Sequence, residues 1–140
     1  MITRQKIGQW LRSGWAGMTI LGLSVLVRGL CYLPTVVPPG HRIPALESVF
    51  PLSVWTAVWI SVGVGTLVCA ALKKAQPMMV GACVALHALW AFLYVGDWLI
   101  GDSRRGYITG LSYLTIALLT IWAFFRGEST QVRVRLDERR

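Results

Sequence analysis

Four long apolar stretches dominate this sequence, and they restrict its fold more than any other feature. They cover about residues 15–33, 51–72, 78–100 and 107–125. A helix of roughly 20 apolar residues crosses the ~30 Å hydrocarbon layer of a bilayer. Helices of this kind satisfy all their backbone amides and carbonyls without water. The sequence therefore predicts an all-α integral membrane protein, built as an antiparallel four-helix transmembrane bundle with chain neighbours adjacent.

Composition supports the same class. The chain has 140 residues, of which 55% are hydrophobic and 14% charged, whereas soluble domains carry about a quarter charged residues. The formal net charge is +8, but the charges lie between and beyond the apolar stretches. This distribution is typical of membrane topology. We therefore expect the lipid bilayer as partner, and no nucleic acid.

The basic residues predict how the bundle is oriented. Ten lie on one side, namely Arg4, Lys6, Arg12, Lys73, Lys74, Arg126, Arg133, Arg135, Arg139 and Arg140. Three lie on the other side, Arg42, Arg104 and Arg105. Cytoplasmic loops carry the excess of Lys and Arg. The prediction is a multi-pass protein of the cytoplasmic (inner) membrane with both termini in the cytoplasm.

The two ends of the chain have alternative interpretations. Arg4, Lys6 and Arg12 precede the first apolar stretch as in a signal peptide, but no small-x-small cleavage site follows, so we expect this stretch to be retained. Residues 126–140 are expected to form a basic cytoplasmic tail. The tail serves as a topology anchor, or it lies against anionic headgroups.

Two charged residues fall within the predicted spans, and such residues are candidates for function. Arg28 and Asp97 lie at similar depth toward the outer leaflet. We expect them to pair between the first and third helices, with Arg104 or Arg105 as competing partners of Asp97. The pair fixes helix register or, alternatively, forms part of a gate or polar pathway; a solvated Asp97 is the third interpretation. A charge-swap double mutant that folds no better than either single mutant would contradict pairing.

Other polar residues in the spans are few. His87 stands near the middle of the third stretch and is expected to hydrogen-bond between helices, rather than to relay protons, because it does not share a helix face with Asp97. Cys31, Cys69 and Cys83 show neither CxxC nor zinc-ligand spacing. They are interpreted as small packing residues.

Small residues recur at helical spacing and predict close helix contacts. Such contacts pack helices within one chain or join several copies, and the spacing does not separate these alternatives. The residues are Ala57, Ser61, Gly65 and Cys69 in the second stretch, Gly81, Ala85 and Ala88 in the third, and Gly106 and Gly110 in the fourth.

Motifs for catalysis are missing from the sequence. It contains no GxGxxG, Walker, HExxH or carboxylate-dyad pattern. The acidic residue that small multidrug exporters need in their first helix is replaced by Arg28. We expect no enzyme activity, no cofactor and no metal.

Several segments together resemble small four-span membrane proteins encoded by bacteriophages of actinobacteria. The segments are Pro51-Leu52-Ser53-Val54-Trp55 leading through Trp59-Ile60 to Gly63, Leu89-Trp90-Ala91 with Trp98, Arg104-Arg105-Gly106, and Tyr113. The resemblance covers the general layout of residues 44–125. It implies a holin-like or accessory membrane protein, often encoded near lysis genes.

Three functions fit these expectations. A holin-like protein permeabilises the host membrane by oligomerising, which requires short length, several spans and close-packing helices but no catalytic residue. An accessory or superinfection-exclusion protein binds a membrane protein partner. A small transporter or channel subunit would depend on Arg28, Asp97 or His87.

Overall fold

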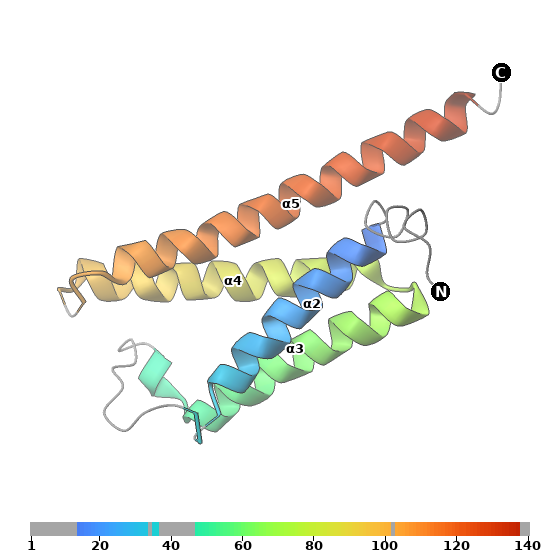
Figure 1. Cartoon of the computed structure of the whole chain (residues 1–140). Helices are drawn as coiled ribbons and strands as arrows, with labels where there is room; N and C mark the ends of the chain where they lie inside the picture. The colour runs from blue at the N-terminus through green and yellow to red at the C-terminus, as the bar shows by residue number, and fades with distance from the viewer. Residues whose placement is uncertain (1–13, 34, 37–46, 102, 138–140) are drawn as a thin grey trace, which may run out of the picture.

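All long elements of the chain are helices in the computed structural model, which describes residues 14–33, 35–36, 47–101 and 103–137 (Figure 1). The long helices are α2 (Gly14–Cys31), α3 (Leu52–Leu72), α4 (Gln76–Leu99) and α5 (Gly106–Asp137), and a short 3-10 helix, η1 (Glu47–Val49), precedes α3. The described residues contain no strand. The predicted all-α class is confirmed.

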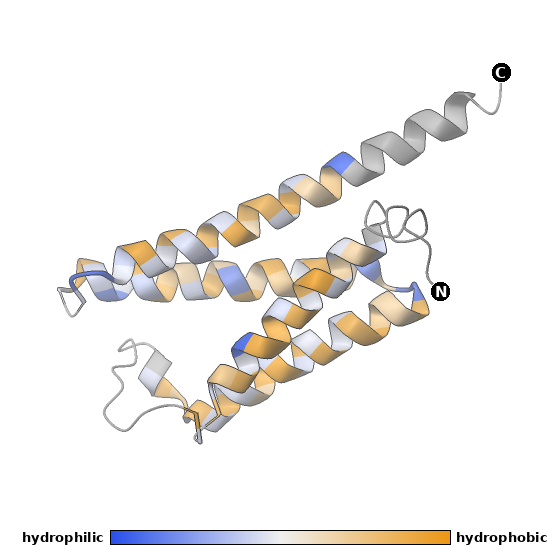
Figure 2. Cartoon of the chain, viewed as in Figure 1, coloured by the Kyte–Doolittle hydropathy of each residue, from blue (hydrophilic) through white to orange (hydrophobic). Residues whose placement is uncertain are grey.

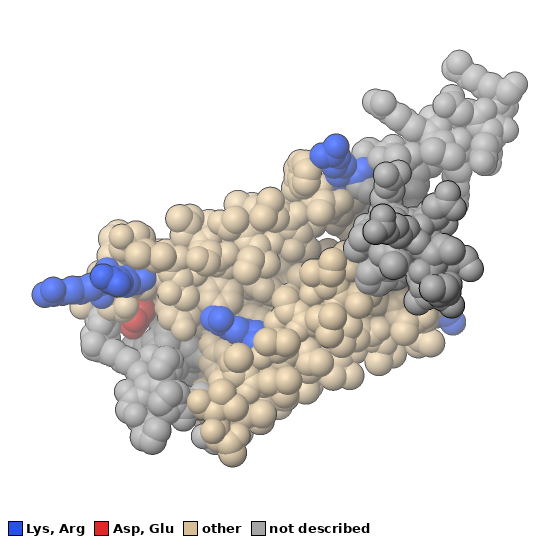
Figure 3. All heavy atoms as spheres, in the orientation of Figure 1, with Lys and Arg blue, Asp and Glu red and all other residues tan. Residues whose placement is uncertain are grey.

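Three of the helices are long and apolar enough to cross a membrane. They are Leu52–Leu72, Gln76–Leu99 and the Gly106–Arg126 part of α5. The apolar part of α2, Trp15–Cys31, is shorter. Apolar residues lie along the described helices (Figure 2). The space-filling view has a largely uncharged surface, with basic side chains toward both ends and a further one between them (Figure 3). The structure is thus compatible with a membrane protein.

The helices form two antiparallel hairpins, α2 with α3 and α4 with α5 (Figure 1). Contacts within each hairpin are the most extensive ones, those between α3 and α4 are fewer, and those between α2 and α4 are fewer still. Helices that are neighbours in the chain therefore pack together, as predicted.

A tight turn connects the two hairpins. Lys73 adopts a left-handed conformation after α3. The amide of Lys74 donates to the carbonyl of Cys69, and that of Lys73 to the carbonyl of Ala70, which closes the helix end as in a Schellman motif. Pro77 lies in the first turn of α4, where its missing N–H costs no helical hydrogen bond.

The core consists of two clusters of buried side chains. The larger one gathers Val25, Trp59, Cys83, Leu86, Trp90, Ala91 and Tyr113 from all four long helices. The smaller one contains Met18, Ala70 and Val80. Since Ala70 and Val80 flank the turn, the smaller cluster lies near the α3–α4 connection, and the larger cluster contains most of the buried aromatic rings.

Candidate functional site

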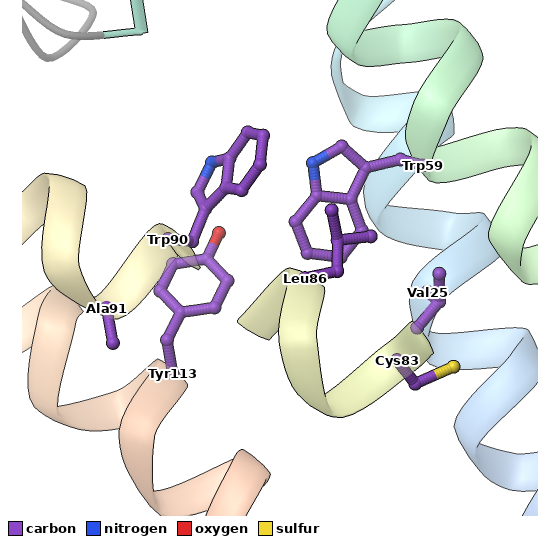
Figure 4. Close-up of a cluster of buried hydrophobic side chains, with 7 residues drawn as sticks. All are labelled: Val25, Trp59, Cys83, Leu86, Trp90, Ala91 and Tyr113. Atoms are coloured by element: carbon purple, nitrogen blue, oxygen red, sulfur yellow. The ribbon is translucent and has the colours of Figure 1, made fainter. Parts of the chain in front are cut away.

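Three aromatic residues from three helices form the centre of the larger cluster (Figure 4). Trp59 of α3 and Trp90 of α4 are fully buried, and their ring centroids lie 5.0 Å apart in an edge-on arrangement. The ring of Tyr113, from α5, lies 6.3 Å from that of Trp59. The Trp59–Trp90 pair has the edge-to-face geometry that aromatic rings favour, and the Trp59–Tyr113 pair is tilted, at 43° between planes. These rings therefore join α5 to the rest of the molecule.

The segment after α2 is fastened to this cluster by hydrogen bonds. The indole Nε1 of Trp90 donates to the hydroxyl of Tyr32 at 2.7 Å. The hydroxyl of Thr56 donates to the backbone carbonyl of Tyr32 at 2.8 Å. Tyr32 thereby connects the end of α2 to α3 and α4.

Arg28 approaches the cluster from α2. Its guanidinium carbon lies 4.6 Å from the centroid of the Tyr113 ring, a cation–π distance. Asp97 is buried in α4. The contact recorded for the Arg28 guanidinium is thus with an aromatic face of α5, and the predicted pair of Arg28 with Asp97 stays a prediction.

Three buried polar atoms at this cluster have no hydrogen-bond partner among the residues that the structure describes. They are Nε of Arg28, Nε1 of Trp59 and the hydroxyl oxygen of Tyr113. The first two can only donate, and the tyrosine hydroxyl can donate as well. Buried polar groups are paired in the great majority of cases. The cluster therefore presents donors that no acceptor of the described residues takes up.

His87 lies beside the same rings. Its Nδ1 is 2.7 Å from the carbonyl oxygen of Cys83, and because a carbonyl only accepts, Nδ1 is the donor. The imidazole packs against Trp59 at 5.5 Å and against Tyr113 at 5.9 Å between centroids. This hydrogen bond lies within α4, so the predicted interhelical hydrogen bond of His87 stays a prediction.

The predicted small residues fall into three groups. Ala57, Ser61, Gly81 and Ala85 are exposed, while Gly65, Cys69 and Ala88 are half-buried. Gly106 and Gly110 are buried against α4. A Cβ atom on Gly106 would lie 2.6 Å from the carbonyl oxygen of Tyr94, and one on Gly110 would lie 3.0 Å from that of Ala91. Oligomerisation through the exposed group stays a prediction.

The arrangement offers binding chemistry. The described residues contain no group of three or more His, Cys, Asp or Glu side chains that could hold a metal ion. What they offer is an arginine, aromatic faces and unpaired donors, which suit recognition of a hydrogen-bond acceptor.

Sequence reasoning named Arg28 and His87 but missed the aromatic members of the site. Trp59, Trp90 and Tyr113 lie away from the helix ends, where tryptophan and tyrosine usually mark the membrane interfaces. An N–H or O–H group that far inside an apolar stretch needs a partner. That position was the signal that could have identified them.

Comparison of the chain with protein-family models, with curated proteins and with solved structures gave no match.

Proposed function

We propose that this chain is a four-span protein of the cytoplasmic membrane with both termini in the cytoplasm. The three membrane-length helices support three of the spans. As the fourth, α2 has 18 residues, or about 27 Å at 1.5 Å per residue, close to the ~30 Å of hydrocarbon. Arg28 lies near the outer end of α2 in this topology. The excess of basic residues in the predicted cytoplasmic segments supports the orientation.

Within that membrane the protein acts without enzymatic chemistry, as a holin-like permeabilising protein of the kind that bacteriophages encode. The observation that carries this proposal is the exposure of α5. Only 17% of its membrane-length apolar segment is buried within the chain, against 39% for α4. Lipid covers such a surface in a monomer, and further copies cover it in an oligomer. A holin requires both states.

Controlled expression tests this function. The gene is induced in a bacterial host while optical density and membrane potential are followed. The proposal predicts undisturbed growth during accumulation, then an abrupt loss of potential. Unperturbed growth with the protein present in the membrane would contradict it.

A matched pair of variants links the timing to self-association. Ser61 and Val68 are both exposed on α3, so a leucine at either position meets no interior of the chain. Ser61→Leu should shift the moment of permeabilisation because it enlarges a small-residue contact. Val68→Leu, seven residues along the same face of α3, adds one methylene group to a side chain that is already large and should shift it much less. Equal timing in both variants would argue against assembly through this face.

The buried cluster around Arg28 favours a second candidate. Permeabilisation has no need of an arginine with an unpaired Nε against a tyrosine ring. An accessory membrane protein that binds a partner would be harmless alone and would co-purify with that partner. A transporter or channel subunit would lose its activity when Arg28, Asp97 or His87 is replaced, while growth is unaffected.

A further inference from the structure

We propose that Arg28, Trp59 and Tyr113 bind an oxyanion, a phosphate or carboxylate group, between the helices of the bundle. Each of the three residues comes from a different helix, α2, α3 and α5, so the site exists only in the folded molecule. The proposed site is inferred from the contacts of these residues. The inference does not depend on whether the chain permeabilises membranes.

The unpaired groups determine which kind of ligand fits. Nε of Arg28, Nε1 of Trp59 and the hydroxyl of Tyr113 are all buried without a partner in the described part of the chain, and all three can donate. The set therefore contains three donors against one acceptor, the Tyr113 hydroxyl oxygen, and neither Arg28 nor Trp59 bonds to that oxygen. Because one donor belongs to a permanent cation, the acceptor that best completes the set carries negative charge.

The neighbouring acceptors are engaged elsewhere. The hydroxyl of Tyr32 accepts the indole N–H of Trp90, and its backbone carbonyl accepts the hydroxyl of Thr56. The carbonyl of Cys83 lies 2.7 Å from Nδ1 of His87. Each of these oxygens thus already accepts one hydrogen bond, and none of them is bonded to Arg28 Nε, Trp59 Nε1 or the Tyr113 hydroxyl. A ligand is the acceptor that we propose for the three groups.

The orientation of the labelled groups is consistent with this. In Figure 4 the hydroxyl of Tyr113 points toward the side of the cluster on which the Trp90 indole lies, and the indole nitrogen of Trp59 is on the edge of its ring that faces Trp90. The guanidinium of Arg28 lies over the ring of the same tyrosine. The donors are therefore held on and around one side chain, Tyr113.

The same contacts argue against a cationic ligand. An aromatic cluster can enclose an ammonium group, but here Arg28 already lies over the Tyr113 face, and a second cation would be repelled. The planar guanidinium matches the oxygens of phosphate and carboxylate. Arg28 is three residues from the end of α2, about 4.5 Å of helix rise, which brings it within reach of a lipid headgroup phosphate as well as a free anion.

Two binding measurements on the full chain in lipid nanodiscs test the proposal and separate these sources. Native mass spectrometry measures retention of phosphatidylglycerol over phosphatidylcholine, and calorimetric titration with inorganic phosphate in phosphatidylcholine nanodiscs measures binding of the free anion. Selective lipid retention supports a headgroup as ligand, and saturable phosphate binding supports a soluble one. The absence of both would overturn the proposal.

Variants assign the binding to the cluster. Arg28→Met should weaken it at least roughly tenfold, because a charge-assisted hydrogen bond is lost. Tyr113→Phe keeps the ring and its packing and should weaken binding by a smaller factor, so it remains informative if Arg28→Met fails to fold. Arg126→Met is the matched control in the phosphate titration, since Arg126 also stacks on an aromatic ring, that of Trp122, at 5.0 Å. Its binding of inorganic phosphate should equal that of the unmodified protein.

Two results would contradict the assignment. One is binding by Arg28→Met that equals that of the Arg126→Met control. The other is binding that appears only after Asp97→Asn, since the carboxylate of Asp97 would then be the partner of Arg28 in the unmodified protein.

Discussion

Gly63 lies where α3 closely approaches the backbone of α2. A Cβ atom there would lie 2.7 Å from the backbone nitrogen of Leu26 and 2.8 Å from its Cα. On the other helix, a Cβ on Gly29 would lie 2.9 Å from the backbone nitrogen of Ile60. Backbone atoms of a helix cannot move aside as the end of a side chain can. Glycine therefore permits the close α2–α3 contact, as small residues do between membrane helices.

Gly63→Ala should lower the free energy of unfolding by about 1–3 kcal/mol, the usual cost of overpacking. Unfolding in mixed detergent micelles, followed by circular dichroism, measures this. Gly81→Ala is the control, because nothing lies within 4 Å of a Cβ at Gly81. Equal stability of the two variants would show that the α2–α3 contact is looser than a 2.7 Å approach at Gly63 requires.

The sequence could not identify this contact face. The predicted stripe on α3 includes Ala57 and Ser61, which are exposed, whereas the buried face comprises Thr56, Trp59, Gly63, Thr66 and Ala70. Both faces contain small residues at helical spacing. Because a membrane helix is apolar all round, no contrast between polar and apolar sides tells the two faces apart.

Helix limits were easier to predict than helix faces. The expected spans 51–72 and 78–100 correspond to α3 (Leu52–Leu72) and α4 (Gln76–Leu99). The limits of a helix that follows a long apolar stretch depend little on its tertiary contacts. α4 begins earlier than expected since Pro77 fits in its first turn. α5 continues to Asp137, beyond the expected end at residue 125, so the helix does not stop where the apolar stretch does.

The turn between α3 and α4 contains backbone strain that a single substitution can relieve. Ala75 has φ = 52°. This left-handed backbone conformation is unfavourable for any residue that has a Cβ atom. Ala75→Gly should raise the free energy of unfolding by about 1 kcal/mol, measured in the same micelles. Ala71→Gly, at an exposed helical position of α3, should lower it by about 0.5–1 kcal/mol. A loss of stability at Ala75 as well would contradict the left-handed geometry.

The molecule as a whole consists of two hairpins connected by the aromatic cluster. Length and composition sufficed to predict helices that could cross a membrane, and three of them meet the length required. The aromatic cluster could not be predicted, because Trp59, Trp90 and Tyr113 lie in three separate stretches and only the packing of the hairpins brings them together. The shortest of the four long helices is α2. Whether it crosses the membrane determines the number of spans and the side on which the N-terminus lies.

The position of the two termini tests the four-span account most directly. Reporter enzymes that are active on only one side of the membrane are fused to the N-terminus and, separately, to the C-terminus, with insertions at Lys74 and Ser103 as references for the cytoplasmic and outer sides. If α2 crosses the membrane, both termini report the cytoplasm, as does Lys74. An N-terminus on the side of Ser103, with the C-terminus in the cytoplasm, would mean three spans and would contradict the account.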